Sequence, residues 1–274
     1  MTIFKQDEIE PIDPNTIKFT LEDIIYLDSI RHRIPRLGRR DSMPHTNHIE
    51  YIRSVLKKNF PNDTTISDLW HYFQVEMQEE KFIPDIAFYE TFKLDRDLKS
   101  YKSIEHGNKI PLLIINMMSQ STWKNDVSEI VKKCLKVKIP FYIVYTMYSI
   151  KVDEYEPPFL RIYEYKEEKN DYEIIEIRRY AKYEESEMIE EKNLYYNEKL
   201  PFRVGLEKIL NIIEGERESR ILIVDKKELK KLLSEKECVE YEKKKIEDEK
   251  KKIEDENIVL RKLIEKYKQK SGNL

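Results

Sequence analysis

The chain has 274 residues, of which 38% are charged and 40% hydrophobic, and its formal net charge is −3. This composition supports one folded domain of moderate size with a long charged appendage. The near-zero total charge excludes a globally basic nucleic-acid binder, because such proteins present a basic face to the phosphate backbone.

The location expected from the sequence is cytoplasmic. No apolar stretch approaches the roughly 20 residues that span a bilayer, so no membrane partner is predicted. The N-terminal MTIFKQDEIE lacks the basic and apolar pattern of a signal peptide. Cys134 and Cys238 lie far apart in the sequence, and we expect both to be free thiols in a reducing compartment.

Residues 1–40 are predicted to form a separate N-terminal arm. From Thr20, TLEDIIYLDSI has a capping-box form followed by an apolar face, which predicts a short helix. A basic cluster follows this helix. Two interpretations stand, a set of phosphate contacts to DNA or a solvated linker. The basic residues are Arg31, Arg33, Arg36, Arg39 and Arg40.

His45 and His48 come next, before a helix that is predicted to end near Lys58. Their spacing of three is compatible with metal ligation. No third ligand stands out beside them, so we favour a structural role for His48 at the start of the helix.

Three strands and one helix are predicted in the middle of the chain. The apolar residues from Phe82 to Tyr89 fall in a short run opened by Pro84, which predicts a strand with Asp85 at its start. The run 112–118, LLIINMM, has the pattern of a strand buried on both faces with Asn116 as a polar intrusion. An unpaired buried amide costs roughly 1–3 kcal/mol, so this residue needs a partner.

Ser and Thr residues at 119–122 predict a turn, and apolar residues at helical spacing then predict a helix up to Lys138. The β-branched and aromatic run from Ile139 to Tyr145 predicts the next strand. Beyond it, the alternating segments within 155–178 predict a hairpin, 180–199 a charged connector, and Arg220–Val224 a last short strand.

The composition shifts to Lys and Glu from Lys226 onward, and KKKIEDE occurs twice in tandem, at 243–249 and 250–256. Apolar residues recur every seven positions, which is the coiled-coil period. A solitary charged helix supported by i,i+4 ion pairs is the competing interpretation, since Glu242, Glu249 and Glu256 occupy the complementary seam position. The expected seam consists of Val239, Ile246, Ile253, Leu260, Leu263 and Tyr267.

Two carboxylates at adjacent strand ends, with a Lys beside them, bind a divalent cation that polarises a phosphodiester and activates water. Over residues 41–270 the chain resembles the Uma-two-type restriction endonuclease family of the PD-(D/E)XK superfamily, in a branch with a C-terminal coiled coil. The order and spacing of the landmarks carry the resemblance. They are MPHTNH, Pro84 with Asp85, Tyr101, Pro111–Thr122, Asp126, IPFYIVY, PPFLRIYEY, DYEIIEIR, LPFRVGLEKILNI and RILIVDKKELKKLLSEKE.

The resemblance implies an α/β fold: a restriction-endonuclease-like core over 41–225, with a mixed β-sheet flanked by helices, followed by a charged helix or coiled coil over 226–274. It also implies a magnesium site, and the chain departs from that site at two positions. The family's second acidic ligand is here Asn116, and its Lys is here Ile130. An amide oxygen can ligate a hard cation, but the lost charge weakens the site, and an aliphatic group cannot stabilise a phosphorane. Only Asp85 remains of the three.

Migrated residues offer one route to a surviving site. Lys133 lies one turn beyond Ile130 on nearly the same helix face, and Glu129 or Asp126 would supply a ligand. Two functions follow. The first is a catalytically degenerate nuclease fold that acts as a binding or assembly module, with the coil joining a second copy or a protein partner. The alternative is an active DNA endonuclease in which Asp85 and Asn116 bind Mg²⁺ and Lys133 assists.

Overall fold

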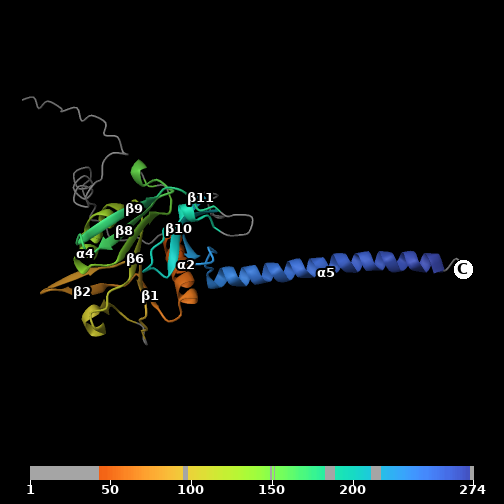
Figure 1. Ribbon diagram of the computed structural model, residues 1–274, viewed down its shortest axis with the longest axis horizontal. Coiled ribbons are helices and arrows are strands. Elements are labelled where there is room, and N and C mark those ends of the chain that lie inside the picture. The colour runs from red at the N-terminus through yellow and green to blue at the C-terminus, as the bar shows by residue number, and fades with distance from the viewer. Residues whose placement is uncertain are drawn as a thin grey trace, which may run out of the picture.

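The computed structural model describes residues 43–94, 98–148, 150, 152–182, 189–210 and 217–271. Within them the protein has a mixed α/β body from which one long helix projects (Figure 1). The predicted mixed α/β fold with a C-terminal helix is confirmed. The arm predicted for residues 1–40, with its helix and its basic cluster, lies outside the described residues.

A six-stranded mixed sheet forms the centre of the body. Strands β6 and β7 are parallel, and every other neighbouring pair is antiparallel. The predicted hairpin is confirmed as β8 and β9. In spatial order the strands are β1 (Thr64–Ser67), β4 (Ile86–Tyr89), β6 (Leu113–Met118), β7 (Phe141–Thr146), β8 (Leu160–Lys166) and β9 (Asp171–Ile177).

Strands β6 and β7 are joined by two helices, α3 (Trp123–Val127) and α4 (Glu129–Val137). The sequence predicted one helix here, but Ser128 leaves the helical region, with φ −126° and ψ −80°, and divides it. Every residue of β6 and of β7 is buried. This confirms the expectation of a strand covered on both faces and explains its continuous apolar run.

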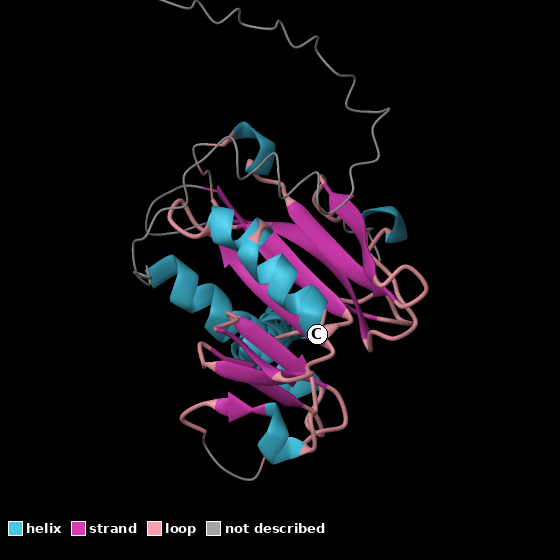
Figure 2. Cartoon of the chain, turned by 90° about the vertical axis from the view of Figure 1, so that its left-hand side faces the viewer, coloured by secondary structure: helices cyan, strands magenta, loops and turns pink. Residues whose placement is uncertain are grey.

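The two faces of the sheet are covered by different layers, because side chains alternate along each strand. Ile114 and Met118 pack with residues of α3 and α4 on one face. Leu113, Ile115 and Met117 pack on the other face with α2 (Met43–Asn59) and a second sheet. Figure 2 shows helices and a small sheet beside the main sheet. Both layers are needed to bury the central strands.

The second sheet is an antiparallel pair, β10 (Phe202–Leu210) and β11 (Arg217–Asp225). The strand predicted for Arg220–Val224 is confirmed and is longer than expected, and β10 was not predicted. Leu232 continues this sheet, since its N–H donates to the carbonyl of Ile223 at 2.9 Å. The chain therefore stays with the body beyond the change in composition at Lys226.

A three-stranded sheet contains β2 (His71–Val75), β3 (Gln78–Phe82) and β5 (Tyr101–Lys102). The strand predicted to start at Asp85 is β4, which begins at Ile86, and Phe82 at the head of the apolar run ends β3. Pro84 lies in the gap, where its missing amide donor does no harm. The described residues also include three short 3₁₀ helices, η1 (Ser103–His106), η2 (Asp153–Tyr155) and η3 (Glu191–Asn193).

The long helix α5 spans Glu235–Ser271 and runs away from the body (Figure 1). It begins with a reciprocal capping box. The N–H of Glu237 donates to Oγ of Ser234 at 3.2 Å, and the N–H of Ser234 donates to Oε2 of Glu237 at 2.9 Å. Within the described residues, none of the helices has both the length and the apolar character of a membrane span.

His71 is fully buried in an aromatic cluster on β2. Its ring lies nearly parallel to that of Tyr89, at a centroid distance of 6.1 Å, and Tyr101 is 5.2 Å away. The Nδ1 atom lies 2.8 Å from the carbonyl oxygen of Leu69, which fixes it as the donor of a neutral ring. Burial lowers the pKa of His71 to about 4, although the bond to Leu69 acts in the opposite direction.

We predict that His71 makes the protein less stable in mild acid. The imidazole of His71 takes up a proton near pH 6.5 in the unfolded chain but only near pH 4 in the folded protein. The contribution of His71 to the free energy of unfolding is therefore complete above pH 6.5 and falls as the pH is lowered. The loss amounts to about 3 kcal/mol by pH 4. Urea unfolding at several pH values should show a shallower dependence in His71→Phe. An identical dependence in both proteins would contradict this account.

Candidate functional site

Asp85 lies directly before β4 and is 3% exposed. Its Oδ2 atom accepts a hydrogen bond from the backbone N–H of Met117 on β6 at 2.6 Å. The same oxygen is 3.3 Å from Nε2 of His45, which α2 supplies from the other layer. The one carboxylate that matches the family's motif therefore joins two strands and a helix.

Asn116 on β6 is also 3% exposed, and both ends of its amide are bonded within the protein. Oδ1 accepts from the backbone N–H of Asp85 at 3.1 Å. Nδ2 donates to Oδ1 of Asp126 on α3 at 2.9 Å. Because an N–H can only donate and a carboxylate only accepts, these partners fix the orientation of the amide. The polar intrusion seen in the sequence is thus a bridge between strand β4 and helix α3.

This bridge has a chemical requirement that the family's Glu does not meet. A Glu at position 116 would accept from Asp85, but it has no N–H to offer Asp126. Two carboxylates would then face each other in a buried place, which is strongly unfavourable unless one is protonated or a cation lies between them. Asn116 and Asp126 are therefore matched to each other.

Ile130 on α4, at the position of the family's Lys, is 6% exposed and belongs to the apolar core between the helices and the sheet. Lys133 is half-buried, and its Nζ donates to the carbonyl oxygen of Lys81 on β3 at 2.9 Å. Glu129 forms an ion pair with Lys132 at 3.3 Å. Lys133 thus contacts β3, and Glu129 contacts another residue of α4. A migrated catalytic role for either residue stays a prediction.

The donors do not fit the magnesium ion that the resemblance implies. Oδ2 of Asp85, Oδ1 of Asn116 and Oδ1 of Asp126 each accept a hydrogen bond from an N–H group. A hard cation needs such oxygens turned toward it, preferably with several negative charges. Across the described ranges, no group of three or more His, Cys, Asp and Glu is placed to hold a metal.

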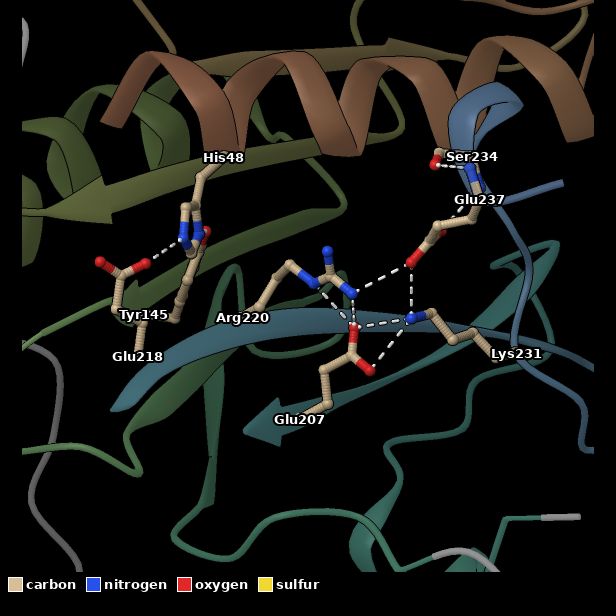
Figure 3. Close-up of polar contacts among 8 residues, drawn as sticks. All are labelled: His48, Tyr145, Glu207, Glu218, Arg220, Lys231, Ser234 and Glu237. Carbon is tan, nitrogen blue, oxygen red and sulfur yellow. Dashed lines mark hydrogen bonds and ion pairs between the residues drawn. The ribbon is translucent and has the colours of Figure 1, made fainter. Parts of the chain in front are cut away.

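His45 and His48, whose spacing suggested a pair of ligands, contact different groups. His45 lies against Asp85, whereas Nδ1 of His48 is 3.0 Å from the Tyr145 hydroxyl and Nε2 is 3.3 Å from Oε2 of Glu218 (Figure 3). Burial lowers the pKa of His48, and the bond to Glu218 only partly opposes this. The structure supports the structural role expected for His48.

A second polar cluster, which sequence reasoning missed, anchors the start of α5 (Figure 3). A guanidinium nitrogen of Arg220 lies 2.6 Å from Glu207 and 3.1 Å from Glu237. Lys231 lies 3.1 Å from Glu207 and 2.8 Å from Glu237. Burial raises the pKa of Glu237, but its contacts to Lys231, Ser234 and Arg220 outweigh this and lower it overall. We call these four charged residues the helix anchor.

The helix anchor connects three parts of the fold. Glu207 and Arg220 come from β10 and β11, and Glu237 lies in the first turn of α5. The guanidinium of Arg220 also covers the ring of Tyr51 on α2 at 3.7 Å. The Ser-x-x-Glu pattern at Ser234–Glu237 was a signal in the sequence that could have located the start of the helix.

Comparisons with known proteins give little to add. No protein-family profile matches the sequence, and no curated protein matches it. Among solved structures, the chain is similar to a protein from Anabaena variabilis described as "a putative nuclease belonging to DUF820", with 14% sequence identity and a TM-score of 0.34. The match covers 59% of this chain and 86% of that chain. A likeness this weak carries no argument about function.

Replacing Asn116 with Leu should destabilise the protein by about 2–4 kcal/mol, because a buried N–H of Asp85 and a buried carboxylate oxygen of Asp126 lose their shared partner. The measurement is urea unfolding. Asn125→Leu is the matched control, since Asn125 is exposed on α3, and we expect a change within about 0.5 kcal/mol. Equal effects of the two substitutions would show that the bridge does not stabilise the fold.

Replacing Glu237 with Ala should loosen the first turns of α5 and cost about 1–2 kcal/mol, because it removes the capping box and leaves Arg220 and Lys231 with only Glu207. Hydrogen exchange should rise most around residues 234–240. Glu240→Ala is the control, because Glu240 is exposed and lies 3.9 Å from Nζ of Lys236 in a long surface ion pair. Unchanged exchange in Glu237→Ala would remove the anchoring role.

Proposed function

We propose that this protein is a catalytically degenerate nuclease-fold protein that serves as a binding and assembly module. Its body is the platform, and its C-terminal helix associates with another chain. The observation that carries the proposal is the Asn116 bridge, in which the residue at the position of the second acidic ligand accepts from the backbone N–H of Asp85 and donates to the carboxylate of Asp126.

The surroundings of the bridge support the same conclusion. Metal-dependent phosphodiester cleavage needs clustered negative ligands for the cation and a cationic or acidic group for the transition state. Here the Lys position is filled by Ile130, a core residue, and Lys133 is bonded to a backbone carbonyl. Both substitutions are integrated into the packing of the fold, as expected of a body that is maintained for stability rather than for chemistry.

The assembly half of the proposal rests on α5. Its apolar stripe is exposed along the whole helix, with Val239, Ile246, Ile253, Leu260 and Tyr267 between 48% and 67% exposed. A stripe repeated every seven residues is the surface that coiled coils bury. The basic cluster of the N-terminal arm remains a predicted contact for DNA.

We predict that the purified protein cleaves neither supercoiled nor linear DNA in the presence of Mg²⁺ or Mn²⁺, because Oδ2 of Asp85, Oδ1 of Asn116 and Oδ1 of Asp126 already accept hydrogen bonds and Ile130 replaces the Lys of the motif. Asp85→Ala is assayed beside it and should behave identically. Cleavage that is present in the wild type and lost in Asp85→Ala would contradict the proposal. That result would establish instead an active endonuclease with a rearranged site, in which Asp85, Asn116 and Lys133 become the residues to test.

The same proteins test the assembly half by sedimentation. The wild type and Asp85→Ala should both be oligomeric, and a chain that lacks residues 238–274 should be monomeric. This deletion keeps the four residues of the helix anchor in the chain. A wild type that is already monomeric would count against self-association, whatever the cleavage assay gives.

A further inference from the structure

The residues along the exposed stripe of α5 also indicate whether a partner helix runs parallel or antiparallel to it. The helix has 37 residues, which corresponds to a length of about 55 Å. The described part of the protein places no other element on this stripe: all five seam residues at the seven-residue spacing are at least 48% exposed. A surface of this length fits another helix of equal length, and a second copy of the chain supplies one.

The stripe is symmetric about its middle residue. Val239 and Tyr267 lie fourteen positions on either side of Ile253, and Ile246 and Leu260 lie seven positions on either side. Two copies that cross at Ile253 therefore superimpose their stripes in either direction. Contacts among these five residues do not distinguish a parallel from an antiparallel pair, whereas Leu263 meets its own copy in a parallel pair and lies opposite Lys243 in the antiparallel one.

The charges of the helix are not symmetric. Residues 239–256 contain eight acidic and six basic residues, whereas residues 257–271 contain one acidic and five basic residues. In a parallel pair, basic ends meet basic ends, and each predominantly acidic half meets its own copy. In an antiparallel pair, each basic end lies along the acidic part of the other helix. Repulsion between like charges in the parallel pair therefore favours the antiparallel pair.

The acidic residues beside the stripe strengthen this preference. Glu242, Glu249 and Glu256 occupy the complementary seam position, so a parallel pair in register sets each of them against its own copy. An antiparallel pair centred on Ile253 sets Glu256 opposite Lys250, and Glu249 opposite Asn257. Two of the three carboxylates then face groups that can donate hydrogen bonds, Glu242 lies opposite Ile264, and no seam Glu faces another.

We propose that two copies of this chain associate through α5 as an antiparallel pair centred on Ile253. This inference rests on the proposed assembly function and specifies its partner and its geometry. The helix anchor fixes where α5 leaves each body, and the helix runs outward from it (Figure 1). The antiparallel pair therefore holds two bodies at opposite ends of a rod, where each presents its surface independently.

Chemical cross-linking tests the direction. In a full-length Cys238→Ser background, Cys134 is fully buried and stays unreactive. Three variants are treated with a short bis-maleimide: Ile246→Cys, Leu260→Cys and the two combined. In the antiparallel pair, position 246 lies opposite position 260, and like positions are about 21 Å apart along the axis. Only the double variant should give a covalent dimer.

The other outcomes each have a definite meaning. Covalent dimers from all three variants would overturn the antiparallel arrangement in favour of a parallel one and leave the assembly function standing. Ile253→Cys controls the register, because it faces itself in either direction. A dimer by sedimentation in which Ile253→Cys does not cross-link would overturn the pairing centred on that residue. A monomer would remove the proposed assembly function as well.

Discussion

The amide of Asn116 is the interaction on which the centre of this structure depends. It links the residue before β4 to helix α3 through β6, with both of its ends bonded. The carboxylate of Asp85 adds a connection to the layer that contains α2. Its Oδ2 atom accepts from the N–H of Met117 on β6 and lies against His45 on α2. A neutral group with one donor end and one acceptor end can do this, whereas a carboxylate would need a cation to compensate its charge. The bridge and a magnesium site are therefore alternative uses of one place.

Polar contacts also determine how the long helix joins the body. Glu237 both caps α5 and receives Arg220 and Lys231 from the second sheet. Such a partly buried network loses much if one member is removed, because the remaining charges stay poorly compensated. The helix consequently leaves the body at a defined place while its apolar stripe remains available to a partner. The body and the start of α5 are joined as one unit, although their compositions differ sharply.

Several parts of this architecture could be predicted from the sequence. The continuous apolar runs of β6 and β7 were recognised because burial on both faces leaves no other pattern. Asn116 was recognised as needing a partner, but its partners were not, since Asp126 is close to it only after α3 folds back onto the sheet. β10 was missed, and the helix anchor too, because its residues are separated in the sequence and meet only in the tertiary structure. The break at Ser128 has no clear sequence signal.

The central claim is that Asp85, Asn116 and Asp126 bond to one another instead of to a metal. A crystal of the protein soaked in Mn²⁺, measured for anomalous scattering, examines those atoms directly. The account predicts no anomalous peak between Asp85 and Asp126, with the Asn116 amide still bridging them. A peak at that place, with the carboxylate oxygens turned toward it and the bridge broken, would contradict the account.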